Sequence, residues 1–193
     1  MCRTISIGAQ SFEFIRKNEC FFVDKTGFIK EWWENQDIVT LLTRPRRFGK
    51  TLNLDMMNCF FSKKYEGRGE LFEGLSIWEE EKYRKLQGSY PVIFLSFANI
   101  KGATLRETKQ GIKYMLEKLY GVHRYVRDGE EMTERDRLFF DSVTSDMTDD
   151  VAVLALHYLS DYMSRYYGQK VLIFLDEYDT PLQEAYVYGY WKE

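Results

Sequence analysis

The chain has few cysteines and few histidines, which excludes two classes of protein. Its 193 residues include only 3 cysteines, Cys2, Cys20 and Cys59. Because their number is odd and no CxxC spacing occurs, free thiols in a reducing compartment fit better than a disulfide framework or a zinc site. The 2 histidines, His123 and His157, are isolated in the sequence. We therefore expect them at surface or helix positions and not as metal ligands.

Long apolar runs and a large excess of one charge are also missing. No stretch approaches the roughly 18 apolar residues of a membrane-spanning helix, and the first residues lack the apolar core of a signal peptide. A net charge of −3 and an isoelectric point near 5.6 argue against a surface that coats nucleic acid generally. We expect a cytoplasmic protein without a membrane segment. With 45% hydrophobic residues, its 193 residues are enough for one domain with a sizeable core.

The basic segment after residues 38–43 has the form of a phosphate-binding loop. Residues 38–43, IVTLLT, are short, apolar and rich in β-branched side chains, so we predict a buried strand there. The loop itself comprises Arg44, Pro45, Arg46, Arg47, Phe48, Gly49, Lys50 and Thr51. Gly49 has no Cβ and lets the main chain approach a phosphate, and Lys50 would reach the β- and γ-phosphate oxygens. Thr51 would place its hydroxyl on Mg²⁺ at the start of a helix predicted over residues 50–61.

Arg44 stands where the usual GxxxxGK[ST] pattern has its first glycine. A glycine there usually has a positive φ, which costs an arginine roughly one or two kcal/mol, so we expect a differently built turn. Pro45, whose φ is fixed, would stiffen its entry. The alternative interpretation is a basic turn between a strand and a helix that serves solubility or contacts nucleic acid.

A second apolar run, residues 171–175, ends in Asp176 and Glu177, which is the form of a Walker B strand. An aspartate at the carboxyl end of a parallel strand next to the phosphate-loop strand can hold Mg²⁺ directly or through water. Glu177 can polarise the water that attacks the γ-phosphate, which is the role of a general base. The alternative is an ordinary buried strand before a helix whose N-cap region is Asp179-Thr180-Pro181.

The rest of the sequence predicts helices around one more strand. We predict helices over residues 12–19, 25–35, 104–120, 133–145 and 149–167, and a buried strand over 92–97. From the phosphate-loop strand onward, the order β–α–β–α–α–β indicates an α/β doubly wound core. We assign residues 1–37 to a helical N-terminal lead-in and residues 38–193 to a partial P-loop NTPase core.

Three segments together resemble a known family. RPRRFGKT at 44–51, VLIFLDEYDTPL at 171–182 and FFVDKTGFIKE at 21–31 are similar to the predicted AAA-ATPase-like family of bacterial proteins, and the likeness covers nearly the whole chain. In that family the arginine-led loop is the usual form. The resemblance implies an AAA-type P-loop NTPase with a three-layer core and a parallel sheet, which binds ATP and Mg²⁺ and is often joined to a C-terminal nuclease-like domain of the PD-(D/E)XK type.

The resemblance also implies roles for individual residues. By position, Lys50 and Thr51 contact the phosphates and Mg²⁺, Asp176 is the carboxylate on the metal side and Glu177 is the catalytic one. The segment Asp24-Lys25-Thr26 is a family signature without an assigned chemical role.

The sequence after Glu177 offers part of one helix and no further strand, so we expect a core that is incomplete at its C-terminus. Mg-dependent hydrolysis is accordingly expected only in the complete protein or assembly. The partners implied are a nucleotide, another copy or partner chain that completes the site, and nucleic acid in the full-length family context, with no membrane. Two alternatives stay open: a non-hydrolysing regulatory or interaction module, and a nucleic-acid-binding module that uses the basic loop on phosphates.

Overall fold

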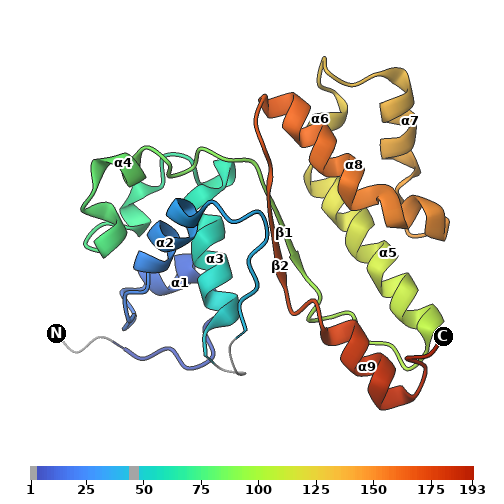
Figure 1. Ribbon diagram of the computed structural model, residues 1–193, viewed down its shortest axis with the longest axis horizontal. Coiled ribbons are helices and arrows are strands. Elements are labelled where there is room, and N and C mark those ends of the chain that lie inside the picture. Colours follow the sequence, from blue (N-terminus) through green and yellow to red (C-terminus); the bar gives the residue numbers. More distant parts are fainter. Residues whose placement is uncertain (1–3, 44–47) are drawn as a thin grey trace. The chain divides into compact units, whose positions relative to one another are not determined.

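The computed structural model describes residues 4–43 and 48–193, which form two compact units, Met1–Val92 and Ile93–Glu193 (Figure 1). Four loop residues of the sequence prediction, Arg44, Pro45, Arg46 and Arg47, lie outside the described residues. The predicted division into a lead-in and an NTPase core at residue 38 stays a prediction.

The described part of the first unit is built from helices and short helical turns. Its elements are α1 (Phe12–Lys17), α2 (Gly27–Asn35), α3 (Lys50–Phe61), the 3₁₀ turns η1 (Lys63–Tyr65), η2 (Gly69–Leu71) and η3 (Ser76–Trp78), and α4 (Glu81–Arg84). α1 contacts α3 and η2, whereas α2 contacts η3. The polar, glycine-broken segment after α3 therefore wraps back onto the N-terminal helices.

The ends of these helices agree closely with the sequence prediction. Ser11 caps α1, since its hydroxyl accepts a hydrogen bond from the Phe14 N–H at 3.3 Å. α3 spans the predicted residues 50–61. α2 begins two residues later than predicted, at Gly27, with Thr26 as its N-cap.

Aromatic side chains form the core of the first unit. Phe60 lies edge-on to Phe61 and to Phe72, with ring centroids 5.0 Å apart in both pairs, and all three are fully buried. Trp32 and Trp33 of α2 contact Phe61 at centroid distances of 5.4 and 5.5 Å. These contacts pack α2 against the C-terminal end of α3.

Residues 38–43 form no strand, so the prediction of a buried strand there is wrong. Ile38 is 100% exposed and Val39 is 86% exposed. Residues 4–43 and 48–91 contain no strand with which this segment could pair, only an isolated bridge between Ser62 and Tyr90. A strand without a neighbour leaves its backbone N–H and C=O groups unpaired, and apolar sequence alone does not supply that neighbour.

The second unit combines a small sheet with long helices. It contains β1 (Val92–Ser96), α5 (Leu105–Val122), α6 (Arg124–Arg127), α7 (Glu134–Ser142), α8 (Asp149–Tyr167), β2 (Leu172–Asp176) and α9 (Thr180–Tyr188). β1 and β2 pair as a parallel two-stranded sheet, and the ladder continues with the Phe97 N–H donating to the Asp176 carbonyl at 2.9 Å. Parallel pairing requires a long crossover, which the helices between the strands provide.

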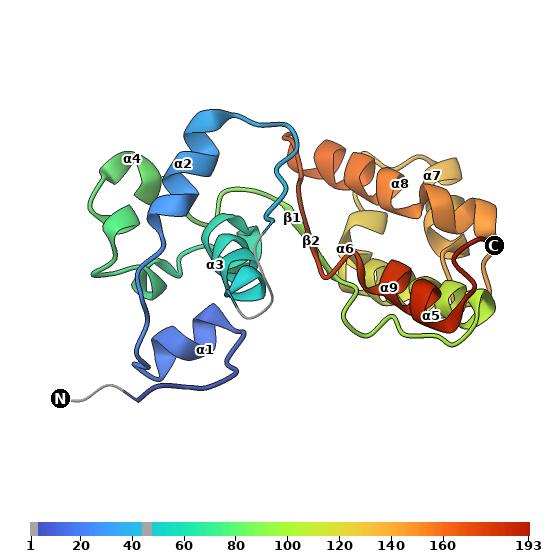
Figure 2. The ribbon, with the colours of Figure 1, turned by 60° about the horizontal axis from the view of Figure 1, so that its bottom comes forward.

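The core of this unit lies between α5 and α8, which run side by side in both ribbon views (Figures 1 and 2). Leu116 and Leu119 of α5 meet Leu159 and Met163 of α8 in one buried cluster. Tyr120 joins the two helices directly, because its hydroxyl donates to the Ala155 carbonyl at 2.7 Å.

The chain is thus a mixed α/β protein with a small parallel sheet. Both strands predicted outside the phosphate loop, 92–97 and 171–175, are present as β1 and β2. The first strand of the predicted order is missing, and the three-layer core stays a prediction. None of the helices in residues 4–43 and 48–193 is long and apolar enough to cross a membrane.

Candidate functional site

The start of α3 carries the described half of the predicted phosphate loop. Gly49 is the N-cap and has a φ of 74°, in the left-handed region that glycine enters without steric cost. Lys50 and Thr51 are the first two residues of the helix, and both are half-buried. As a glycine, Gly49 has no side chain of its own to cap the helix. The N-terminal N–H groups of a helix carry partial positive charge and bind anions, so the segment has the chemistry of a phosphate site.

Phe48, also predicted to belong to the loop, is 60% exposed. Phe48 comes two residues before the first residue of α3, and its exposed ring contributes little to the core of the first unit. The structure therefore places Phe48, Gly49, Lys50 and Thr51 together at one turn, as adjacent residues must be, and leaves the other loop residues outside its description.

The carboxyl end of β2 carries the two predicted carboxylates. Asp176 is the last residue of β2 and is 4% exposed. Glu177 follows with a φ of 51°, and its carbonyl accepts a hydrogen bond from the Thr180 N–H at 3.0 Å. A non-glycine residue in this region stores roughly one or two kcal/mol of strain, and such strain is concentrated at functional sites.

The turn after Glu177 leads directly into α9. Asp179 is the N-cap residue of α9, and Pro181 lies in its first turn. Both positions agree with the sequence prediction of a helix start. Lys50 and Thr51 belong to the first unit, whereas Asp176 and Glu177 belong to the second, so each half of the site is formed within its own unit.

The oxygen groups in the two predicted motifs are ligands that suit magnesium. The Thr51 hydroxyl and the Asp176 carboxylate are hard oxygen ligands of the type that Mg²⁺ prefers. Over the part of the chain that the structure describes, no three His, Cys, Asp or Glu residues gather into a metal-binding cluster. Mg²⁺ at nucleotide sites is bound by one or two protein oxygens together with phosphates and waters, which needs no such cluster.

None of the described cysteines and histidines belongs to the two predicted motifs, and Cys2 lies outside the described residues. Cys20 and Cys59 are free and buried, and burial raises the pKa of the Cys59 thiol to about 12. His157 lies on α8, and His123 is the C-cap of α5, where burial lowers its pKa to about 4. His157 is an exposed helix residue and His123 directly follows a helix, in agreement with the expected surface or helix positions.

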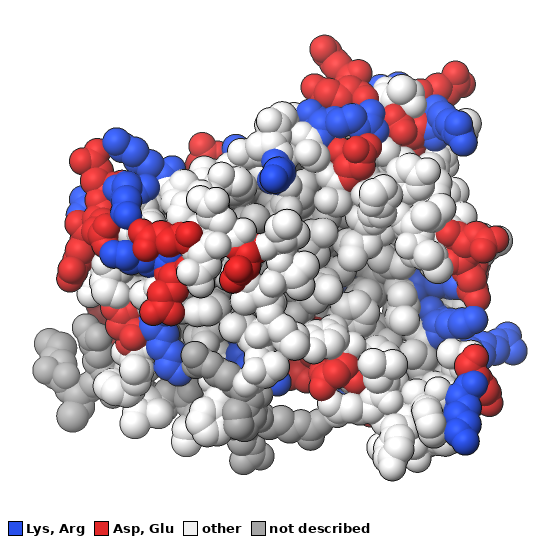
Figure 3. Space-filling view, viewed as in Figure 1, with Lys and Arg blue, Asp and Glu red and all other residues white. Residues whose placement is uncertain are grey.

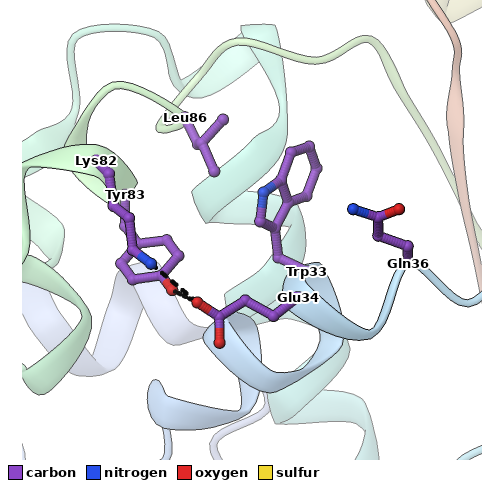
Figure 4. A pocket seen from close by; sticks show the side chains of 6 residues that line it. All are labelled: Trp33, Glu34, Gln36, Lys82, Tyr83 and Leu86. Carbon is purple, nitrogen blue, oxygen red and sulfur yellow. Dashed lines mark hydrogen bonds and ion pairs between the residues drawn. The ribbon is translucent and has the colours of Figure 1, made fainter.

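A pocket of about 320 Å³ in the first unit was not predicted from the sequence (Figure 4). Its lining residues come from α2 and from α4 with the turn after it: Trp33, Glu34, Gln36, Lys82, Tyr83 and Leu86. Glu34 Oε1 accepts hydrogen bonds from Lys82 Nζ at 2.9 Å and from the Tyr83 hydroxyl at 2.5 Å. The charged groups of the pocket thus satisfy one another, and none of the predicted site residues lines it.

Charged side chains of both signs are mixed on the face shown in Figure 3. In the part of the chain that the structure describes, several charged side chains are paired, as where Arg127 contacts Asp128 and Asp141, or where Arg68 contacts Glu13 and Glu70. The mixture of charges on the face in Figure 3 differs from the broad basic stripe that proteins use to bind nucleic acid along its backbone.

A helix entered through glycine, lysine and threonine, together with a parallel strand that ends in a buried aspartate, is a combination found in nucleotide-binding α/β proteins. Comparison of the sequence with known families gives the more specific assignment. The chain belongs to the AAA-ATPase-like family, described as predicted AAA-ATPase, and the match covers residues 6–191. The suspected family is therefore confirmed.

A curated relative is an uncharacterized protein in the vnfD 5' region of Azotobacter chroococcum mcd 1. It is 29% identical to this chain over 182 residues, which are 93% of this chain and 30% of the relative. The chain thus spans about 30% of the length of the curated relative that it matches. No solved structure matches the chain.

Proposed function

We propose that the chain binds a nucleoside triphosphate, ATP by family resemblance, together with Mg²⁺. The phosphates bind at the loop of residues 44–51 and the start of α3. Thr51 and Asp176 hold the metal, and Glu177 is the general base for hydrolysis in the complete protein or assembly. The Mg²⁺, when bound, neutralises charge that develops on the phosphates.

The observation that carries this proposal is the geometry at the start of α3. Gly49 turns the chain with a positive φ, and Lys50 begins the helix directly after it. The N–H groups of the first helical turn and the Lys50 ammonium would bind phosphate oxygens at the same point. A basic turn that served only solubility would not need the glycine conformation.

The end of β2 supports the metal and catalytic roles. Asp176 lies buried at the carboxyl end of a parallel strand, and a carboxylate in that position can hold Mg²⁺ directly or through water. Glu177 leaves the strand in a strained conformation that directs the chain away from the sheet. Glu19 and Gln36 have similar positive φ values of 50° and 53° at other turns, so the catalytic role of Glu177 rests on its place directly after Asp176.

The test is the binding of Mg-ATP to the 193-residue chain, measured by calorimetry and by thermal shift. We expect the wild type to gain a few degrees in Tm at saturating Mg-ATP. Lys50→Ala should abolish the gain, because the ammonium that holds the phosphates is lost. Lys63→Ala, a lysine in η1 of the same unit, is the matched control and should keep it.

Three outcomes separate the proposal from its alternatives. If Lys50→Ala binds Mg-ATP as well as the wild type, the proposal is wrong. Turnover in the full-length protein that disappears in Glu177→Gln while binding persists would support the general-base role, whereas binding without any turnover would favour a regulatory module. Salt-sensitive DNA binding in place of nucleotide binding would favour a nucleic-acid module.

A further inference from the structure

The signature Asp24-Lys25-Thr26 is the one sequence motif to which the proposed function gives no role. The structure shows what two of its residues contact. Asp24 Oδ1 accepts hydrogen bonds from the Thr26 N–H at 2.8 Å and from the Thr26 hydroxyl at 2.6 Å. Asp24 Oδ2 accepts one from the Ser76 N–H at 2.8 Å. The carboxylate therefore links the start of α2 to η3, fifty residues later in the sequence.

Thr26 completes this link from a fully buried position. Its Oγ1 donates to Asp24, accepts from the Ile77 N–H at 3.2 Å and lies 3.0 Å from Ser76 Oγ. Because the single hydroxyl proton of Thr26 goes to Asp24, the Ser76 hydroxyl must be the donor in the last pair. All hydrogen-bonding capacity of Thr26 is thus used, and valine, which has the same shape, could replace none of it.

Burial raises the pKa of Asp24, but the hydrogen bonds from Thr26 and Ser76 outweigh it and lower the pKa below its usual value. The group is thus ionised at neutral pH and accepts hydrogen bonds without donating any. Lys25, between the two, is exposed: its carbonyl accepts a hydrogen bond from the Phe28 N–H at 3.0 Å, and its side chain forms no ion pair among the residues that the structure describes. The side chains of Asp24 and Thr26 thus bond to each other and to η3, whereas the side chain of Lys25 does not.

The other end of α2 is joined to the segment that leads into the phosphate loop. Trp32 Nε1 donates to Thr40 Oγ1 at 3.1 Å, and the Trp32 ring packs on Phe61 at the end of α3. Thr40 precedes the first loop residue, Arg44, by four positions. The hydrogen bond from Trp32 to Thr40 therefore connects α2 to the chain just before the loop.

We propose that Asp24 and Thr26 are positioning residues for the phosphate loop: they fix α2 on η3, and α2 holds residues 38–43 through the bond from Trp32 to Thr40. When the role is measured by nucleotide affinity, it rests on the proposed function; when it is measured by proteolysis, it does not. Neither residue touches the nucleotide. Lys25 takes no part in the positioning.

The experiment compares Thr26→Val, Thr26→Ser and Lys25→Ala in the 193-residue chain, well below each variant's Tm. Thr26→Val should weaken Mg-ATP binding at least about tenfold, since small displacements of a supporting shell are costly at a site. Thr26→Ser keeps the hydroxyl and should restore the affinity, and Lys25→Ala should bind as the wild type does. Asp24→Asn, which keeps the shape but loses the acceptor for the Ser76 N–H, replaces Thr26→Val if that variant fails to fold.

A stability control separates positioning from general weakening. Arg16→Ala removes hydrogen bonds from Arg16 to the Leu71 and Glu73 carbonyls, which join α1 to η2 without involving α2. It should lower Tm without weakening nucleotide affinity. If Arg16→Ala weakens binding as much as Thr26→Val at a similar loss of Tm, or if Thr26→Val binds like the wild type, the positioning role is overturned.

A second readout needs no nucleotide. Trypsin cleaves after arginine except before proline, so Arg46 and Arg47, but not Arg44, are its sites in the loop. Thr26→Val should speed cleavage at these sites, whereas Arg16→Ala should not. If the wild type fails to bind Mg-ATP, the proposed function fails, and the cleavage rates still decide the positioning role. Equal cleavage of the wild type and Thr26→Val would then overturn it.

Discussion

Glu177 shows at the scale of one residue how the candidate site differs from the turns around it. It has a φ of 51° directly after β2, a conformation that is costly for any residue with a Cβ. Replacement by glycine and by alanine removes the same carboxylate. Only glycine also removes the strain. The difference in stability between the two variants therefore measures the effect of the backbone conformation alone.

We predict that Glu177→Gly is more stable than Glu177→Ala by about 1 kcal/mol, because relief of about 1–2 kcal/mol of strain exceeds the roughly 0.5–1 kcal/mol entropic cost of glycine. Urea denaturation of the two variants measures the difference. The same pair at Gln183, an exposed position in α9, should show the opposite order, with alanine more stable. Alanine more stable at both positions would contradict the strained conformation of Glu177.

At the scale of elements, the helices followed from the sequence because their signals are local. Thr104 caps α5 through the Glu107 N–H, and Thr133 forms a capping box with Asp136 at the start of α7. Each signal lies within a few residues of the helix it starts. Residues 38–43 failed as a strand because strand formation depends on a partner elsewhere in the chain, which composition does not reveal.

The same distinction applies to the candidate site. Gly49, Lys50 and Thr51 are adjacent, so the helix start could be predicted from their order alone. The contacts of Asp24 and Thr26 with Ser76, and the pocket between α2 and α4, join segments about fifty residues apart. Nothing in the local pattern specified which distant residues would meet there.

One link between elements should depend on pH. Asp149, at the start of α8, binds Lys109 Nζ at 2.8 Å and Lys113 Nζ at 2.9 Å on α5. Hydrogen bonds from these two lysines lower the pKa of Asp149 from 3.8 to about 2. Because the folded-state pKa is lower, the pair stabilises the fold fully above about pH 4, and this stabilisation is lost as pH falls toward 2.

We therefore predict that Asp149→Asn lowers Tm at neutral pH and that the difference from the wild type shrinks between pH 4 and 2. The difference should also shrink at high salt, because the side chains of Asp149 and Lys109 are exposed to solvent. Asp150→Asn is the matched control: it removes the same charge from the same turn without breaking either ion pair. A pH-independent deficit in Asp149→Asn would contradict the ion-pair account.

At the scale of the whole molecule, the second unit carries a hydrophobic core of its own. Its buried cluster includes residues of β1, α5, α7 and α8, and the β1–β2 ladder lies beside it. Such a unit meets the usual requirement for independent folding, which is a core that neighbouring parts need not complete.

We predict that residues 91–193 expressed alone fold with helical circular dichroism and a cooperative thermal transition. Leu159→Ala, which opens a cavity at a fully buried position of α8, should lower the unfolding free energy of this fragment by about 2–5 kcal/mol. Val153→Ala, at an exposed position of the same helix, is its control. A fragment without a cooperative transition would show that its core depends on residues 1–90.

Residues 38–43 have a consequence for handling the protein. The hexapeptide IVTLLT is uncharged and β-prone, contains neither proline nor glycine, and includes exposed Ile38, Val39 and Leu41. Segments of this composition stack into intermolecular sheets, and charged or proline neighbours such as Asp37 and Pro45 act as gatekeepers against that. Aggregation of the purified chain will therefore begin at these six residues.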